Sequence, residues 1–335
     1  MHYILLAFLF VPFIIFINSQ FKKHKMLLNY NGEKHQKFTT KDQIPLTGGI
    51  FIFLYSVIFY YEYNSLFCLY LLSFLILGIL SDKKITASPK LRFFIQISLV
   101  IVFVFEFNLT ISDIRIDYLN YLLENDFFKY FFVVFCLMIL INGTNFIDGC
   151  NTLVVGYYII VAFIVYHLKL YEYLNISNEI FLSLLVFLAI LYIFNFFDKF
   201  YLGDSGSYLI SIIIGSILIL IYQTNSQISP YFIVVLLWYP AFETFFSILR
   251  KSFKKDSPLE PDTNHLHQLI FLFLNKKFKN NKYNNPLSSN IINIYNFILL
   301  FLASGKIQDS KFQIMIIVIN IVIYLLVYLN FYNYN

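Results

Sequence analysis

Residues 202–222 read LGDSGSYLISIIIGSILILIY. The second half of this stretch is an apolar run of the kind that crosses a bilayer as a helix, which takes about 20 residues. The first half places Asp204 among two glycines and two serines, where that helix would begin. Such a helix start binds anions, and a carboxylate there is suited to holding Mg²⁺ against a phosphate. An ordinary helix cap explains the same residues, so the stretch predicts a membrane helix that begins either in a phosphate site or in a simple cap.

The whole chain shares the apolar composition of this stretch. Its 335 residues are 59% hydrophobic and 13% charged, where soluble domains have about 45–50% and about 25%. The 41 Phe and 27 Tyr exclude a disordered chain, and a net charge of +5 spread over several loops argues against a nucleic-acid partner. The three cysteines show neither a disulfide framework nor CxxC metal spacing. This composition predicts a polytopic helical membrane protein.

Apolar runs recur along the chain and predict an all-α bundle of about 10–11 transmembrane helices, which forms a single domain over residues 1–335. We expect spans at 3–18, 46–62, 66–80, 91–107, 130–142, 152–168, 180–197, 207–222, 230–249, 290–303 and 312–331.

The basic residues predict how the bundle is oriented. With the N-terminus outside, the cytoplasmic segments hold 19 of the 24 Lys and Arg, and these segments are 19–44, 81–92, 143–151, 198–206 and 250–289. Cytoplasmic loops are enriched in basic residues, which anchor them to anionic lipid. The same segments hold the clustered Asn and the paired His, so we expect an active site at the cytoplasmic face of the lipid bilayer.

Segment 142–151 carries a polar residue at every third position: Asn142, Asn145, Asp148 and Asn151. On a helix this spacing lines the four side chains along one stripe. Unpaired amides and carboxylates beside an apolar span are costly. Helix packing through Asn is one explanation, but a polar ligand or a metal–phosphate group would satisfy more of these side chains at once.

Two further segments offer chemistry with competing explanations. Asp82 stands at a helix end beside two lysines, either as a site residue or as a solvated interfacial acid. Pro45 with Gly48 and Gly49 allows close approach of either a ligand or a neighbouring helix.

The cytoplasmic segment 250–289 is expected to be a structured loop over the site. His265 and His267 are two residues apart, which argues against a helical zinc pair, and both could donate to a phosphate. Glu243 is the acid placed at membrane depth, where it faces the bundle interior or pairs with Arg250.

Five motifs in this order, IPLTGGI, GILSD, NGTNFIDG, LGDSGS and SPLEPDTNHLHQL, resemble those of the polyprenyl-phosphate N-acetylhexosamine-1-phosphate transferases, the MraY/WecA group. The resemblance implies that polyprenyl (undecaprenyl) phosphate attacks the sugar-side phosphorus of a UDP-N-acetylhexosamine and releases UMP. It implies Mg²⁺, with Mn²⁺ as an alternative, and leaves a homodimer open. It also implies the bacterial inner membrane and a product that starts a surface glycan or a cell-wall precursor.

The resemblance assigns roles residue by residue. It implies catalytic Asp82, Asp148 and Asp204, a metal held by Asp204 and Asp148, and substrate contacts from Asn142, Asn145, Asn151, His265, His267, Lys34, Gly48 and Gly49.

The chain departs from the family's usual motifs at three positions. Ser81 stands where the family usually has the first of two Asp, Asn151 where it often has an Asp, and Gln268 where it has a third His. A non-catalytic homologue therefore stays open. A transporter or flippase is the alternative from another class, but it should show internal repeats and ionisable residues near the midplane, for which Glu243 is the one candidate in the sequence.

Overall fold

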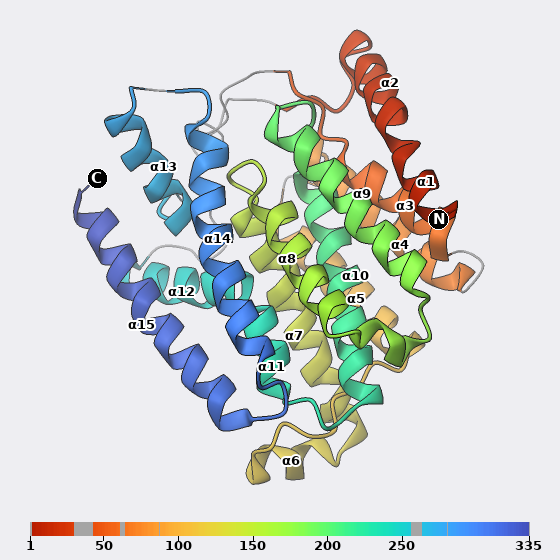
Figure 1. The fold of residues 1–335 in the computed structure, drawn as a ribbon, viewed down its shortest axis with the longest axis vertical. Helices are drawn as coiled ribbons and strands as arrows, with labels where there is room; N and C mark the ends of the chain where they lie inside the picture. The colour runs from red at the N-terminus through yellow and green to blue at the C-terminus, as the bar shows by residue number, and fades with distance from the viewer. Residues whose placement is uncertain are drawn as a thin grey trace.

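The computed structural model describes residues 2–29, 43–60, 64–86, 88–255, 263–279 and 281–334. Within these ranges every regular element is a helix (Figure 1), and the one β contact is an isolated bridge between Leu28 and Pro45. The all-α prediction is therefore confirmed. Lys34, predicted to contact substrate, lies outside the described residues.

Each expected span corresponds to one helix or to a consecutive pair. The helices are α1 (His2–Phe8), α2 (Phe10–Lys23), α3 (Gly48–Tyr60), α4 (Ser65–Asp82), α5 (Pro89–Glu106), α6 (Asp117–Leu123), α7 (Asp126–Ile147), α8 (Leu153–His167), the 3-10 helix η2 (Leu170–Leu174), α9 (Asn178–Phe196), α10 (Gly203–Thr224), α11 (Pro230–Leu236), α12 (Trp238–Lys254), α13 (Leu266–Lys277), α14 (Asn284–Ser304) and α15 (Ser310–Tyr334).

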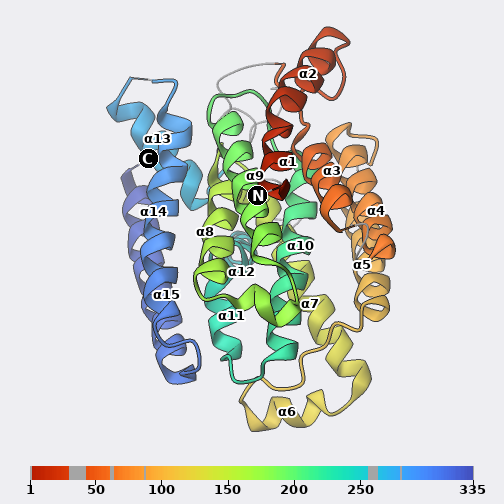
Figure 2. The same cartoon turned by 45° about the vertical axis from the view of Figure 1, so that its right-hand side comes forward.

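Seven spans in the described chain are long and apolar enough to cross a membrane, with α1 and α2 counted together as Tyr3–Lys23. Helices α3 and α8 are apolar but shorter, and α5 carries three charged residues. The chain is thus a polytopic membrane bundle. Figure 2 shows α14 and α15 at one edge, α4 and α5 at the other, and α10 between them.

The expected span at 230–249 corresponds to two helices that form a bent pair. Helices α11 and α12 meet at 78°, and α12 runs crosswise to the other long helices (Figure 1). Pro240, in the first turn of α12, explains the break, because proline has no N–H to donate to residue 236 and its ring clashes with that carbonyl. The apolar run hides this bend, since hydropathy does not register the direction of a helix.

Helix α10 is the centre of the bundle. Its apolar window is 94% buried, and α3, α4 and α7 pack against it. At its start the neighbouring backbones come so close that a Cβ on Gly78 would lie 2.2 Å from the Cα of Ser205, and one on Gly49 would lie 2.7 Å from the Cβ of Ser205. A Cβ on Gly48 would lie 2.7 Å from the Cα of Leu202. Close helix packing, one of the two explanations expected for Gly48 and Gly49, is therefore present in the structure, and their contact with a substrate stays a prediction.

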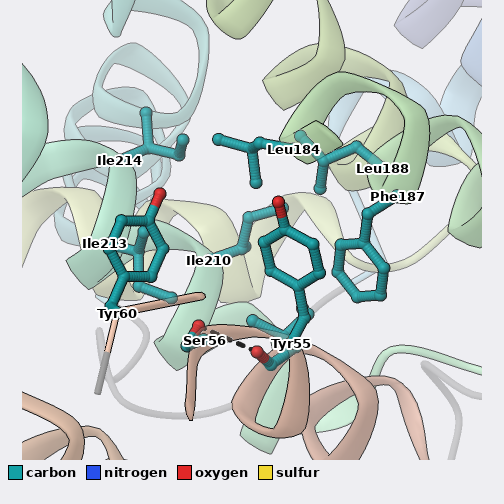
Figure 3. A pocket seen from close by; sticks show the side chains of 10 residues that line it. Tyr55, Ser56, Tyr60, Leu184, Phe187, Leu188, Ile210, Ile213 and Ile214 are labelled. Atoms are coloured by element: carbon teal, nitrogen blue, oxygen red, sulfur yellow. Dashed lines mark hydrogen bonds between the residues drawn. The ribbon is translucent and has the colours of Figure 1, made fainter. Parts of the chain in front are cut away.

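A cavity of about 20 Å³ lies between α3, α9 and α10 (Figure 3). Tyr55, Phe187 and Ile213 contribute apolar surface to it, and such a volume holds about one water molecule. The cavity is a packing defect of the core and is too small for a sugar nucleotide or a lipid.

The loops segregate to two ends of the bundle, as the orientation requires. At the end expected outside, Arg115 donates to the carbonyl of Gln308 at 2.8 Å, to Oγ of Ser310 at 3.0 Å and to the carbonyl of Gln227 at 2.9 Å. Residues from three separate connections are thus in contact there, and the clustered polar segments meet at the opposite end.

Candidate active site

Asp82 forms the bottom of the site by binding the start of α10. Its Oδ1 accepts from the N–H of Asp204 at 2.8 Å, and its Oδ2 accepts from the N–H of Ser205 at 3.3 Å and from the hydroxyl of Ser205 at 3.0 Å. Gly203 has φ +70°, and a Cβ there would lie 2.9 Å from both Asp82 oxygens. Asp82 is therefore the anion at this helix N-terminus, and the interpretation as a solvated interfacial acid is wrong.

Asp204 is the second residue of α10, and side chains from three other helices donate hydrogen bonds to its carboxylate. Its Oδ1 accepts from Nδ2 of Asn145 at 2.6 Å. Its Oδ2 accepts from Ser81 Oγ, from Arg92 Nη1 at 3.1 Å and from Tyr208 OH at 3.4 Å. The carboxylate is 24% exposed, so it is held firmly and remains within reach of a ligand. It is not the simple cap of its own helix, because Leu202 stands at that position.

Arg92 is a site residue that the sequence reasoning missed. It lies in the first turn of α5 and also donates to Ser81 Oγ at 2.7 Å. The guanidinium is 33% exposed, which leaves part of it open to an anion. The usable signal was its position in segment 81–92, directly after the Asp82 motif, where it is the single Arg among lysines.

Asp148 is the third carboxylate, at the C-cap of α7. Burial, and then the negative charges of Asp204 and Asp82, raise the pKa of Asp148 well above its usual range. The structure thus brings together three carboxylates that repel one another. A proton or a bound cation would relieve that repulsion.

The prediction of one continuous stripe over 142–151 is wrong beyond Asp148, because α7 ends at Ile147. Asn142 donates to Gln96 Oε1 at 3.2 Å and to the carbonyl of Met138 at 2.8 Å. Asn151 donates to Asp198 Oδ1 at 2.5 Å. Asn145 and Asp148 therefore belong to the carboxylate cluster, whereas Asn151 belongs to a separate buried network.

The two histidines lie next to each other at the start of α13. His265 is its N-cap, with extended backbone, so its ring can stack on that of His267 with the centroids 5.6 Å apart. A Cβ on Gly149 would lie 2.4 Å from Nε2 of His267. The histidines are thus held against the connection that carries Asp148. Segment 250–289, expected to be a loop, contains α13 and the first turns of α14.

Glu243 is fully buried on α12 and orients the first histidine. Its Oε2 lies 3.0 Å from Nδ1 of His265, and its Oε1 accepts from Tyr324 OH at 2.7 Å. The expected pairing with Arg250 is wrong, since Arg250 donates instead to Tyr328 OH at 2.9 Å. A buried carboxylate at Nδ1 fixes the orientation of the His265 ring, so that Nε2 is the ring nitrogen left to contact another group.

The residues fit a magnesium ion that is shared with a substrate. In the described ranges no three His, Cys, Asp or Glu side chains form a group that could hold a metal. Mg²⁺ is commonly bound by one or two carboxylates together with water and substrate phosphates. Asp204 and Asp148 could supply such carboxylates, because burial and then the nearby charge of Asp204 raise the pKa of Asp148.

Several known proteins are similar to this chain in sequence. Residues 64–222 match the sequence profile described as Glycosyl transferase family 4. The probable undecaprenyl-phosphate N-acetylglucosaminyl 1-phosphate transferase of Bacillus subtilis is 28% identical over 205 residues, 59% of this chain and 56% of that protein. The undecaprenyl-phosphate alpha-N-acetylglucosaminyl 1-phosphate transferase of Escherichia coli O157:H7 is 28% identical over 282 residues, 78% of this chain and 74% of that protein. The enzyme of the same name from Thermotoga maritima is 25% identical over 229 residues, 68% of each chain.

The matched region runs from α4 through α10 and therefore contains Asp82, Asp148 and Asp204. The three carboxylates lie inside the matched region, in agreement with the resemblance seen in the motifs. The chain is thus similar to glycosyl transferase family 4 and to the MraY/WecA-like enzymes.

Proposed function

We propose that this protein transfers an N-acetylhexosamine-1-phosphate group from a UDP-sugar to polyprenyl phosphate and releases UMP. One observation carries the proposal. Three carboxylates from helices far apart in the chain meet at the start of α10, at one end of a membrane bundle, and two histidines pack against the connection that carries Asp148. The names of the relatives support a polyprenyl-phosphate acceptor.

The geometry is suited to bringing together two negatively charged substrates for reaction. An oxygen of the lipid phosphate forms a bond to the sugar-side phosphorus, and the bond from that phosphorus to UMP breaks. Arg92 attracts phosphate, while Asp204 and Asp148 would hold Mg²⁺. When bound, this ion neutralises phosphate charge and orients the two groups. Asp82 keeps the start of α10 in place.

No residue needs to act as a base on the acceptor. A phosphate monoester has its second pKa near about 6 and is mostly ionised at neutral pH. Asp82 is already occupied by two backbone N–H groups and a hydroxyl, which suits a positioning role. His265 and His267 would contact the diphosphate, with Glu243 fixing the first ring.

The proposal includes the location of the reaction. The site end of the bundle holds the segments rich in Lys and Arg, which favours the cytoplasmic face of a bacterial inner membrane. There a cytosolic UDP-sugar and a lipid phosphate at the bilayer surface can meet.

The test uses purified protein with polyprenyl phosphate, Mg²⁺ and radiolabelled UDP-GlcNAc, UDP-GalNAc or their deoxy derivatives. We expect UMP release with at least one donor, dependent on both the lipid and the cation. A folded bundle that releases no UMP with any of these donors would contradict the proposal in favour of a non-catalytic homologue or a transporter.

A further inference from the structure

A second feature lies outside the carboxylate cluster, in a groove between α2 and α9. Its volume is about 410 Å³, and it is lined by Ile15, Asn18, Ser19, Lys22, Phe194 and Lys199. One part of this lining is apolar and the other part carries two lysines and an amide. Nothing in the transfer reaction uses these residues.

The amide of Asn18 is incompletely satisfied. The side chain is 6% exposed, and its Oδ1 accepts from Thr47 Oγ1 at 2.6 Å. Its Nδ2 is buried without a hydrogen-bond partner. A buried donor without an acceptor is costly, and an acceptor oxygen of a ligand in the groove that Asn18 lines would satisfy it.

The charge around the groove is positive and uncompensated. Lys22 lies in the last turn of α2, and Lys199 follows the end of α9. In the described part of the chain neither ammonium group has a carboxylate partner. Asp198, the acid next to Lys199 in sequence, is directed to Asn151 at 2.5 Å. The ligand is therefore an anion.

The apolar wall identifies the class of anion. Ile15, one turn below Ser19 on α2, is 58% exposed, as is Phe16 beside it. Both residues belong to a candidate membrane span, so this part of the groove faces lipid. A free phosphate or a nucleotide gains nothing from such a wall, whereas a lipid places its headgroup at the lysines and its chain along the helices.

We propose that this groove binds an anionic phospholipid of the bilayer, with its phosphate held by Lys22, Lys199 and Nδ2 of Asn18 and one acyl chain against Ile15 and Phe194. The site connects to the start of α10. Thr47, which donates to Asn18, precedes Gly48, whose N–H donates to the carbonyl of Tyr201 at 3.2 Å. A bound lipid would therefore steady the segment that packs on the first turn of α10.

The test is binding of phosphatidylglycerol, with phosphatidylcholine as the neutral lipid, to the full-length purified protein measured by native mass spectrometry. We expect selective retention of phosphatidylglycerol and a loss of about tenfold or more in the double variant Lys22→Gln/Lys199→Gln, since each lysine contributes independently to headgroup attraction. The matched control is Lys23→Gln/Lys25→Gln, which removes the same amount of charge next to Lys22, from residues that do not line the groove. It should change retention less than about twofold.

The variant Asn18→Asp tests the contribution of the amide to lipid binding separately from that of the two lysines. It keeps the acceptor for Thr47 but replaces the free donor with a carboxylate, so it should reduce phosphatidylglycerol retention at least as strongly. Equal losses in the groove pair and the control pair would overturn the proposal, because they would show general surface attraction. Equal retention of both lipids by the unaltered protein would overturn it as well.

A crosslinking measurement on the unaltered protein tests the proposal even if the variants fail to fold. A photoactivatable phosphatidylglycerol should crosslink to peptides containing residues 15–22 and 194–199. Crosslinks confined to other peptides would contradict the proposal. Displacement of the probe by an equimolar amount of polyprenyl phosphate would show instead that the groove serves the acceptor lipid.

Discussion

Asp204 is the residue on which the site depends, because donors from α4, α5 and α7 converge on its carboxylate. Where the family usually has an Asp, Ser81 donates a hydrogen bond to Asp204 and accepts one from Arg92. The missing carboxylate is thus replaced by a neutral group that fits between the two charges. The cluster keeps three carboxylates and an arginine, which is consistent with a working site.

The substitution Asp204→Asn should lower turnover at least about 100-fold, because it removes the charge that would pair with a cation at the phosphates while keeping the side chain's shape. Turnover is measured as UMP release, and folding as the melting temperature. The control is Asp126→Asn, on a carboxylate that is 86% exposed at the other end of α7, and it should leave turnover unchanged. Unaltered turnover in Asp204→Asn would show that this residue is not an essential ligand.

Sequence patterns identified Asp82, Asp148, Asp204 and Asn145 because each lies beside a glycine or a helix end in a polar cluster. They could not show that Asn151 turns to Asp198, or that Glu243 pairs with His265. These partners are separated by 47 and 22 residues. Such pairs depend on how helices pack, and the spacing within one segment carries no information on that.

At the scale of elements, glycines set the distance between α10 and its neighbours. Gly78 faces backbone, since a Cβ there would lie 2.2 Å from the Cα of Ser205. Gly215 faces side chains, with the nearest atoms at 2.8 and 2.9 Å on two leucines. Side-chain ends can move, whereas a buried backbone cannot.

Gly78→Ala should therefore lower the melting temperature by about 3–10 °C, as overpacking by one methyl against fixed backbone costs about 1–3 kcal/mol. Gly215→Ala is the matched variant, in the contact of α10 with α7, and it should shift the melting temperature by less than about 2 °C. Differential scanning fluorimetry in detergent measures both. If the two variants melt alike, α4 and α10 do not approach as closely as described.

The junction of α12 and α13 depends on the buried Glu243. Glu243→Gln removes the charge that holds His265 and leaves an amide of the same size. On the proposed function, the KM for the UDP-sugar should rise about tenfold with a smaller change in kcat, because a histidine that contacts the diphosphate is less well oriented.

Trp238→Phe is the control for this variant. It removes a buried hydrogen bond to Asn296 at the first residue of α12, five residues before Glu243, so it tests whether structural loosening alone has the same effect. Trp238→Phe should lower the melting temperature of the protein and leave the KM for the UDP-sugar nearly unchanged. Equal effects of the two variants on KM would contradict a positioning role for Glu243.

On the scale of the whole molecule, hydropathy predicted where the apolar helices lie, because every expected span corresponds to a helix or a pair of helices, and seven of these are long and apolar enough to cross a membrane. It could not predict the 78° bend between α11 and α12, where Pro240 interrupts an apolar run. It also did not distinguish the helix α13 from the loop around it. That helix has only 12 residues, which is too short for a membrane span, and it is fixed by packing on α14 and α15.

The orientation can be tested with single cysteines in a background without Cys68, Cys136 and Cys150. Lys83→Cys lies at the site end and Glu124→Cys at the opposite end, and both positions are exposed. A membrane-impermeant maleimide applied to intact cells should label Glu124→Cys and spare Lys83→Cys, because the basic segments stay inside. After lysis both should react. Labelling of Lys83→Cys in intact cells would reverse the orientation.

The central claim is that the three carboxylates at the start of α10, with the two histidines beside the connection that carries Asp148, serve transfer of a sugar phosphate to a lipid. The most direct measurement is mass spectrometry of the lipid fraction after incubation of purified protein with polyprenyl phosphate, Mg²⁺ and the UDP-sugar donors, together with quantification of UMP. The account predicts a polyprenyl-diphospho-sugar formed in equimolar amount with UMP. UMP with free sugar-1-phosphate, or no new lipid with any donor, would contradict it.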